Sequence, residues 1–229
     1  MAVNLRNTNT VAINGLKVLV YGEAGAGKTT LIKTLPKPVI LSAEGGLLSL
    51  RKENLPFIEI HTVEELRDAA KWLETSAEAK QFESVALDSI SEIAEVVLSN
   101  EKALNKDGRA AYGNMNDIMA KVIRSFRDLT NKHVYFSAKM EKAQDETGAM
   151  LFAPSMPGKT LTQGLPFFFD EVFALRVSRN DKGETMRMLM CRPDGMWTAK
   201  DRAGALEPWE APDLGAIITK IGGGTNENA

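Results

Sequence analysis

The sequence has little cysteine and little histidine. Its 229 residues include one cysteine, Cys191, and two histidines, His61 and His133. A single cysteine excludes an internal disulfide framework and a zinc site built on several cysteines, and it suits a reducing compartment. The two histidines lie far apart in the sequence and form no metal-binding motif, so we expect both to be structural.

Long hydrophobic runs and a charge imbalance are also absent. No apolar stretch approaches the roughly 18 residues that a membrane span needs, and no basic–apolar–small signal region opens the chain. We therefore expect a cytoplasmic protein without a membrane partner. The net charge of −2 gives no global signature of nucleic-acid binding. Any contact with DNA must come from local basic patches.

The composition is that of an ordinary globular protein. Hydrophobic residues make up 44% of the chain and charged residues 25%, and the length suits one large domain. We predict a single domain over residues 15–221. A polar segment, residues 1–14, should be a loose arm, and the glycine-rich tail 222–229 should be disordered.

The strongest motif lies near the start of this domain. Gly22 to Thr29 reads G-x-x-x-x-G-K-T, after the apolar run Lys17 to Tyr21 and before a predicted helix over 30–34. Strand, glycine loop and helix are the context of a phosphate-binding P-loop. Such a loop turns its backbone N–H groups around a phosphate, its lysine reaches the β- and γ-phosphates, and its threonine hydroxyl ligates Mg²⁺. The sequence thus predicts ATP and Mg²⁺ as ligands, with nucleotide contacts from Gly22, Gly25, Ala26, Gly27, Lys28, Thr29 and Thr30.

Strands and helices alternate after the P-loop. Short apolar runs predict strands at 38–42, 57–60, 84–88 and 133–138. Thr62 and Ser89 each precede a glutamate by three residues and should cap helices. A third amphipathic helix should carry Ile118, Val122 and Phe126 on one side. This order predicts an α/β fold with a mostly parallel sheet flanked by helices.

Turn signals organise the rest of the chain. Residues 105–116 are rich in turn formers and should be a loop, while 141–166 should be a mobile loop or a small hairpin. Residues 180–183 separate two predicted strands, 170–177 and 184–191, which gives an antiparallel C-terminal hairpin. Met186, Met188 and Met190 alternate on the second strand and are expected on a core face.

Two carboxylates follow predicted strands. Asp88 ends the strand at 84–88, where a P-loop protein needs an anchor for Mg²⁺. Glu44 follows the strand at 38–42, and Gly45-Gly46 after it leave room for a nucleotide or a water molecule. We interpret Glu44 as the general base that orients the attacking water. Glu92 is a rival, although its position in a capping box already gives it a structural role.

These pieces together resemble the RecA core. Its order is a P-loop, a strand ending in the catalytic glutamate and a strand ending in Asp-Ser, as in Gly22–Thr29, Ile40–Glu44 and Val85–Ser89. More closely, the chain is similar to the phage RecA-like ATP-binding proteins of recombination modules, the Sak-four type of single-strand annealing protein. That resemblance implies a RecA-like ATPase in the host-cell cytoplasm, with single-stranded DNA and a single-strand-binding protein as expected partners.

The resemblance also assigns two DNA-binding segments. Residues 107–113 lie where RecA-like proteins carry their first DNA-binding loop, and residues 142–164 lie where they carry the second. Single-strand binding needs basic groups and aromatic faces. The two segments supply both kinds, in Lys106, Arg109 and Tyr112 and in Lys142, Phe152 and Lys159.

A further element points to self-assembly. Residues 198–204 resemble the Lys-x-Arg element of the DnaB-helicase and KaiC branches, whose lysine and arginine reach the γ-phosphate of a neighbouring subunit. Lys200 and Arg202 would then act in trans, and hydrolysis would require a homo-oligomer, either a ring or a filament. The chain departs from the family at Lys139, where RecA proteins have an amide that senses the γ-phosphate. It also lacks a Phe-x-x-Ala polymerisation motif.

The function expected from the sequence is therefore that of a Mg²⁺-dependent RecA-like ATPase that binds single-stranded DNA and promotes annealing or strand exchange. Two other classes remain open at this stage. A nucleotide kinase would transfer a phosphoryl group to a small acceptor and would have no use for Lys200 and Arg202 in trans. A non-catalytic module would use ATP only as a switch.

Overall fold

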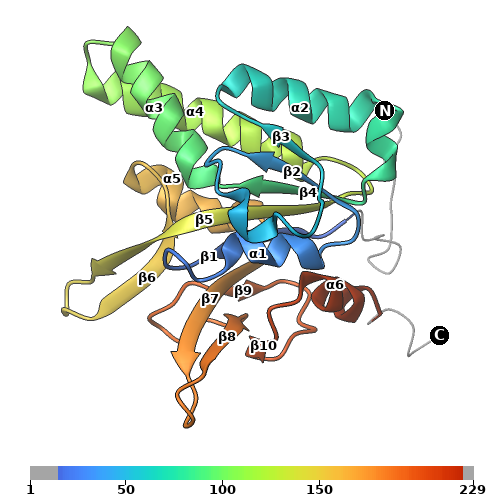
Figure 1. The fold of residues 1–229 in the computed structure, drawn as a ribbon. Helices are drawn as coiled ribbons and strands as arrows, with labels where there is room; N and C mark the ends of the chain where they lie inside the picture. The colour runs from blue at the N-terminus through green and yellow to red at the C-terminus, as the bar shows by residue number, and fades with distance from the viewer. Residues whose placement is uncertain (1–14, 224–229) are drawn as a thin grey trace, which may run out of the picture.

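The computed structural model describes residues 15–223 (Figure 1). A single sheet contains ten strands. They are β1 (Lys17–Tyr21), β2 (Pro38–Ser42), β3 (Phe57–Glu59), β4 (Ser84–Asp88), β5 (His133–Gln144), β6 (Met150–Ser155), β7 (Glu171–Arg179), β8 (Thr185–Met190), β9 (Lys200–Asp201) and β10 (Trp209–Glu210). The predicted arm 1–14 lies outside the described residues.

Residues 15–223 also form six α-helices and four 3-10 helices. The α-helices are α1 (Lys28–Leu31), α2 (Val63–Thr75), α3 (Ile90–Leu104), α4 (Gly108–Arg127), α5 (Lys159–Gly164) and α6 (Leu214–Gly223), and the 3-10 helices are η2 (Ile32–Thr34), η3 (Leu47–Leu50), η4 (Glu78–Gln81) and η5 (Leu165–Phe168). Helix α6 continues two residues past the predicted domain end at Ile221, and residues 224–229 of the predicted tail lie outside the described part. No helix within residues 15–223 is long and apolar enough to cross a membrane.

The sheet runs in the order β10-β8-β7-β1-β5-β4-β2-β3. Every pair from β3 to β7 along this order is parallel, whereas β8 and β10 join antiparallel at one end. The predicted α/β fold with a mostly parallel sheet and a C-terminal antiparallel hairpin is confirmed. Because the carboxyl ends of parallel strands meet at one edge of a sheet, the segments after β1, β2 and β4 are brought together there.

Two layers of helices bury the sheet. In Figure 1, α2, α3 and α4 cover one face, and α1 and α6 lie against the other. Strand β1 shows the alternation: Leu19 and Tyr21 pack in the cluster on the first face, and Val18 and Val20 in the cluster on the second. A strand buried on both faces must be apolar at every position, which is why β1, β2 and β4 were readable from the sequence.

The helix starts follow the predicted caps. Thr62 forms a complete capping box with Glu65 at the start of α2, and the Ser89 hydroxyl accepts the N–H of Glu92 at the start of α3. The predicted loop over 105–116 is wrong from Gly108 onward, because α4 begins there. The Asp107 side chain caps this helix by accepting the N–H of Arg109, and Ala111 is buried on its inner side.

The hairpins are partly as predicted. Asn180–Gly183 forms the turn between β7 and β8, and within 141–166 the hairpin alternative is confirmed, with β5 and β6 paired antiparallel. The expectation of a core face for three methionines is wrong at Met186, which is 43% exposed, although Met190 is buried. The β7–β8 hairpin runs beyond the helices that cover the sheet, so only its base is buried.

Candidate active site

The glycine loop 22–27 connects β1 to α1 at the carboxyl edge of the sheet. Gly27 has φ +107°, a backbone conformation that side-chain-bearing residues rarely adopt. A Cβ added to Gly22 would lie 2.8 Å from the carbonyl oxygen of Leu175 on β7. Two glycines of the motif are thus required by the local backbone, independently of any ligand.

A cavity of about 680 Å³ opens over this loop. It gathers eight of the residues predicted to contact nucleotide or act on it. These are Gly22, Gly25, Gly27, Lys28, Thr29, Thr30, Glu44 and Asp88. Ala26 does not line the cavity and is buried behind the loop. Residues from three separate strand ends therefore share one cavity, as their order along parallel strands predicts.

Lys28 lies across the loop rather than out in solvent. Its Nζ donates to the carbonyl oxygens of Gly22 and Glu23, at 2.9 and 3.0 Å. The Tyr135 hydroxyl donates to the Lys28 carbonyl at 2.8 Å and fixes the start of α1. Burial lowers the pKa of Lys28, although the nearby Asp88 and Glu44 carboxylates oppose this effect. The ammonium group is thus held at the loop, and no carboxylate among residues 15–223 forms a salt bridge with it.

Asp88 accepts two hydroxyl groups. Thr29 Oγ1 donates to its Oδ2 at 2.6 Å, and the Ser137 hydroxyl donates to its Oδ1. Magnesium takes oxygen ligands, and in nucleotide sites it uses one or two from the protein together with water and phosphate. The hydroxyl of Thr29 and the carboxylate of Asp88 are adjacent oxygen donors at the cavity wall, and this donor set fits Mg²⁺.

Glu44 is held beside Asp88 by Ser89. The Ser89 hydroxyl donates to Glu44 Oε1 while it also accepts the N–H of Glu92. The N–H of Ala43 donates to the Asp88 carbonyl at 2.8 Å, which joins the ends of β2 and β4. The carboxylate of Glu44 thus has a fixed place in the cavity. Its rival Glu92 is an ion-pair partner of Lys139 instead, at 2.8 Å.

Two lysines of β5 also line the cavity. Lys139, at the position where the sequence departs from RecA, pairs with both Glu92 and Glu95 at 2.8 Å. Burial alone would lower its pKa, but the two carboxylates outweigh that effect and raise it. Lys142 pairs with Glu23 of the loop at 2.9 Å. The extended part of β5 is therefore attached to the cavity through ion pairs.

The predicted DNA-binding residues fall into two groups. Lys106, Arg109 and Tyr112 are exposed around the start of α4. Lys102 Nζ lies 5.2 Å from the centroid of the Tyr112 ring, and a Cβ added to Gly158 would lie 3.2 Å from that ring. The first predicted segment and the start of α5, where Lys159 lies, are therefore neighbours.

The second group lies on the β5–β6 hairpin. The Phe152 ring stacks on Trp197 with a centroid distance of 4.1 Å and an angle of 10°. The Arg176 guanidinium also lies over the Trp197 ring, 3.8 Å from its centroid. Lys142 is already paired with Glu23. One face of the Phe152 ring is thus occupied within the chain, which limits its use for stacking on a base.

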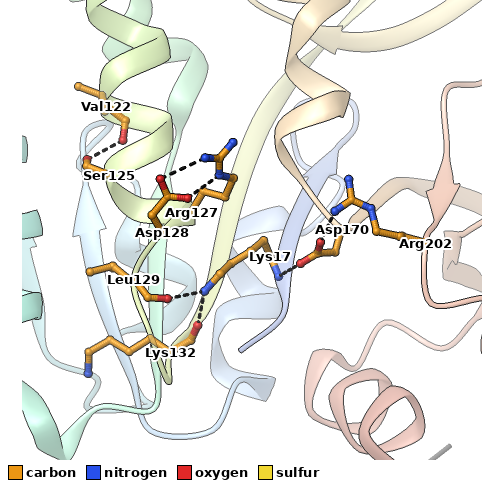
Figure 2. Close-up of polar contacts among 9 residues, drawn as sticks. All are labelled: Lys17, Val122, Ser125, Arg127, Asp128, Leu129, Lys132, Asp170 and Arg202. Atoms are coloured by element: carbon orange, nitrogen blue, oxygen red, sulfur yellow. Dashed lines mark hydrogen bonds and ion pairs between the residues drawn. The ribbon is translucent and has the colours of Figure 1, made fainter. Parts of the chain in front are cut away.

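Lys200 and Arg202 lie at the edge of the sheet opposite the P-loop, beside the amino end of β7. Lys200 Nζ donates to the carbonyl oxygens of Pro166 and Phe169, at 3.2 and 2.6 Å, and Arg202 pairs with Asp170 at 2.7 Å. Figure 2 shows Arg202 and Asp170 beside Lys17, the first residue of β1, whose N–H donates to Asp170. The length of β1, about 16 Å for five residues, separates this group from the P-loop, so neither side chain reaches the cavity of its own chain.

A buried glutamate lies next to this group. Glu171 is fully buried, its Oε1 accepts the N–H of Ala203 at 3.2 Å, and its Oε2 has no hydrogen-bond partner among the described residues. Burial, together with the nearby carboxylates of Asp201 and Asp170, raises the pKa of Glu171 to about 8.

This pKa predicts a pH-dependent stability. Between pH 4.5 and pH 8 the native Glu171 keeps a proton that the unfolded chain has lost, so its contribution to the unfolding free energy falls as pH rises, by about 1.4 kcal/mol per pH unit. Glu171→Gln should remove this slope. Denaturant unfolding of both proteins at pH 6 and pH 8 gives the change of unfolding free energy with pH. An equal change in the two proteins would contradict the raised pKa of Glu171.

Four residues at the site were not predicted to serve it. They are Ser89 on Glu44, Ser137 on Asp88, Tyr135 on the Lys28 carbonyl and Arg187, whose Nε donates to the Ala26 carbonyl at 2.9 Å. A serine inside the apolar run of β5 was a usable signal for Ser137, because a buried hydroxyl needs a partner. Nothing in the local sequence around Arg187 indicates the P-loop.

Comparisons with known proteins show the family of this chain. A family model described as an AAA domain matches residues 14–203. No curated protein matches the chain. Among solved structures, a KaiC-like protein from the hyperthermophilic archaeon Pyrococcus horikoshii is similar, with 15% identity over 77% of this chain and 79% of that chain and a TM-score of 0.46. The family match includes the P-loop, Glu44, Asp88 and the segment with Lys200 and Arg202.

Proposed function

This chain belongs to the AAA-domain family of P-loop proteins. We propose that it is a Mg²⁺-dependent ATPase that self-assembles and binds single-stranded DNA in phage-type recombination. The observation that carries the proposal is the shared cavity of Lys28, Thr29, Asp88 and Glu44. Hydrolysis of a nucleoside triphosphate needs a cation, here Lys28, and two oxygen donors for a metal, here Thr29 and Asp88. It also needs a carboxylate that is not a metal ligand, here Glu44.

Each residue has a defined part in this reaction. The loop N–H groups and the Lys28 ammonium would bind the phosphates, and Thr29 and Asp88 would hold Mg²⁺, which when bound would supply positive charge to the phosphate oxygens. Glu44 accepts a hydrogen bond from a water and orients it toward the γ-phosphate, with Ser89 fixing the carboxylate.

The DNA part of the proposal rests on the surface around the start of α4. Lys102, Lys106, Arg109 and Lys159 are exposed cations there, and Tyr112 is the aromatic residue among them, 38% exposed. Cations that follow a phosphate backbone and an aromatic face for a base are the two requirements of single-strand binding. The overall charge of −2 means that this binding depends on the local patch.

The self-assembly part of the proposal rests on the position of Lys200 and Arg202. Because β1 separates them from their own P-loop, they can serve a γ-phosphate only on a second copy of the chain. Arg202 is the better placed of the two, since its side chain is 55% exposed and its one ion pair, with Asp170, is at the surface. Lys200 must first release the two carbonyl oxygens that it binds.

ATP hydrolysis measured with and without single-stranded DNA, over a range of protein concentration, tests the proposal. We expect DNA to stimulate the rate and the specific activity to rise with concentration, because each site is completed by a neighbour. Arg202→Ala should abolish the concentration dependence, whereas Arg179→Ala, an exposed arginine of the β7–β8 hairpin, should not. A hydrolysis rate that changes neither with added DNA nor, per molecule, with protein concentration would refute both DNA binding and the trans role of Lys200 and Arg202.

A further inference from the structure

The β7–β8 hairpin brings an arginine to the P-loop. Arg187 lies on β8 opposite Val177 of β7, and its Nε donates to the carbonyl oxygen of Ala26 at 2.9 Å. A Cβ added to Gly27 would lie 3.4 Å from Arg187 Nε and 3.5 Å from its Cδ. The side chain therefore extends along the last two residues of the loop before Lys28.

The strand alternation determines the side of the sheet on which Arg187 lies. Leu189 and Cys191 follow it at intervals of two residues, and both are buried in the cluster that α1 joins. Arg187 points to that same face but lies beyond the buried part of the strand, so it reaches the loop and not the core. Met190, which lies between Leu189 and Cys191, belongs to the cluster on the opposite face.

The charge of Arg187 is not neutralised by the protein. The hydrogen bond to Ala26 is the one polar contact of its side chain within residues 15–223, and it uses Nε alone. Lys139 and Lys142, two cations of β5 that line the cavity, are each paired with carboxylates. A guanidinium has five N–H donors, so the edge formed by Nη1 and Nη2 remains available to a ligand.

We propose that Arg187 is a nucleotide-binding residue that contacts the phosphate chain from the β7–β8 hairpin of the same subunit. The argument rests on the proposed function, since it assumes that the loop binds a nucleotide. Guanidinium groups bind phosphate oxygens through charge-assisted hydrogen bonds. Here the Ala26 carbonyl positions the group, and the phosphates supply the opposite charge that the protein does not.

The test measures binding of MgATP and of inorganic tripolyphosphate with Mg²⁺ by isothermal titration. Arg187→Ala should weaken both ligands by on the order of tenfold. Arg187→Gln, which keeps an N–H donor near Ala26 without the charge, should weaken both similarly, and Arg187→Lys should recover part of the loss. Arg179→Ala removes the same charge from the same hairpin and should bind both ligands as the original chain does.

The outcomes separate this inference from the proposed function. If the unmodified chain fails to bind MgATP, the proposed function fails. If it binds and Arg187→Ala binds equally well, the inference alone is overturned. Recovery by Arg187→Gln would make Arg187 a support of the loop only, and a loss limited to MgATP but absent with tripolyphosphate would mean a contact with the nucleoside. Either result refutes a phosphate contact.

Discussion

Glu44→Gln is expected to lower kcat for ATP hydrolysis by on the order of a hundredfold or more, while ATP binding is retained. A positioned general base contributes roughly 10²–10⁴-fold to the rate, and the amide keeps the size of the carboxylate but cannot accept the proton of water. Glu44 is not a phosphate ligand in this arrangement, because its carboxylate carries the same sign of charge as a phosphate and accepts the hydroxyl of Ser89, the residue after β4. Binding should therefore change little.

Two variants sharpen this experiment. Ser89→Ala removes the hydroxyl that holds Glu44, so kcat should fall, but by less than in Glu44→Gln, since the base itself remains. Glu53→Gln is the control, because Glu53 is a surface glutamate paired with Lys33 at 3.0 Å. Single-turnover hydrolysis and a separate titration with ATP give the two quantities for every variant.

The result also decides between functions that the sequence left open. A module that uses ATP only as a switch would show little hydrolysis before or after the substitution. A nucleotide kinase would transfer the γ-phosphoryl group to an added acceptor faster than to water. Full hydrolysis by Glu44→Gln would contradict the assignment of Glu44 as the general base. Glu92, the rival candidate that pairs with Lys139, would then be the next residue to substitute.

The site could be read from the sequence because its parts follow buried parallel strands. Strands β1, β2 and β4 are apolar at nearly every position, and each ends in a polar residue or loop that the sheet then brings to one edge. Glu44 and Asp88 share a cavity with Lys28 for that reason. The chemistry was predictable as far as the strand ends determine it.

Contacts between distant segments could not be read in this way. Arg187 reaches Ala26 across 161 positions, and Lys142 reaches Glu23 across 119. Both depend on where the hairpins lie in the sheet, which local patterns do not specify. The start of α4 was missed for the opposite reason, since glycine and asparagine there signal a turn locally, and burial of Ala111 and Met115 overrides that preference.

The run Phe167–Phe169 shows how far one sequence pattern can divide in the fold. Its three aromatic side chains, taken alone, favour burial. Phe169 is 1% exposed and lies edge-on to Phe136 of β5, with ring centroids 5.2 Å apart, whereas Phe167 is 80% exposed. Phe136 also meets Phe126 of α4, at 5.9 Å. Phe136 is therefore the residue that joins β5, α4 and the segment before β7.

Phe136→Ala should consequently destabilise the protein by about 3–5 kcal/mol, the usual cost of removing a fully buried phenylalanine. The loss has two sources: less apolar surface is buried, and a cavity opens between the two rings that remain. Because Ser137 follows directly and donates to Asp88, a shift of β5 should weaken ATP binding as well. Denaturant unfolding, with its midpoint and slope, measures the stability.

Phe167→Ala is the matched control, because it is the same substitution at a side chain that is 80% exposed. A change within about 0.5 kcal/mol is expected there. If the two variants lost equal stability, the packing of β5 against α4 described here would be wrong. If Phe167→Ala instead left stability unchanged but abolished the dependence of ATPase activity on protein concentration, Phe167 would belong to the surface between subunits, next to the carbonyl of Pro166 that Lys200 binds.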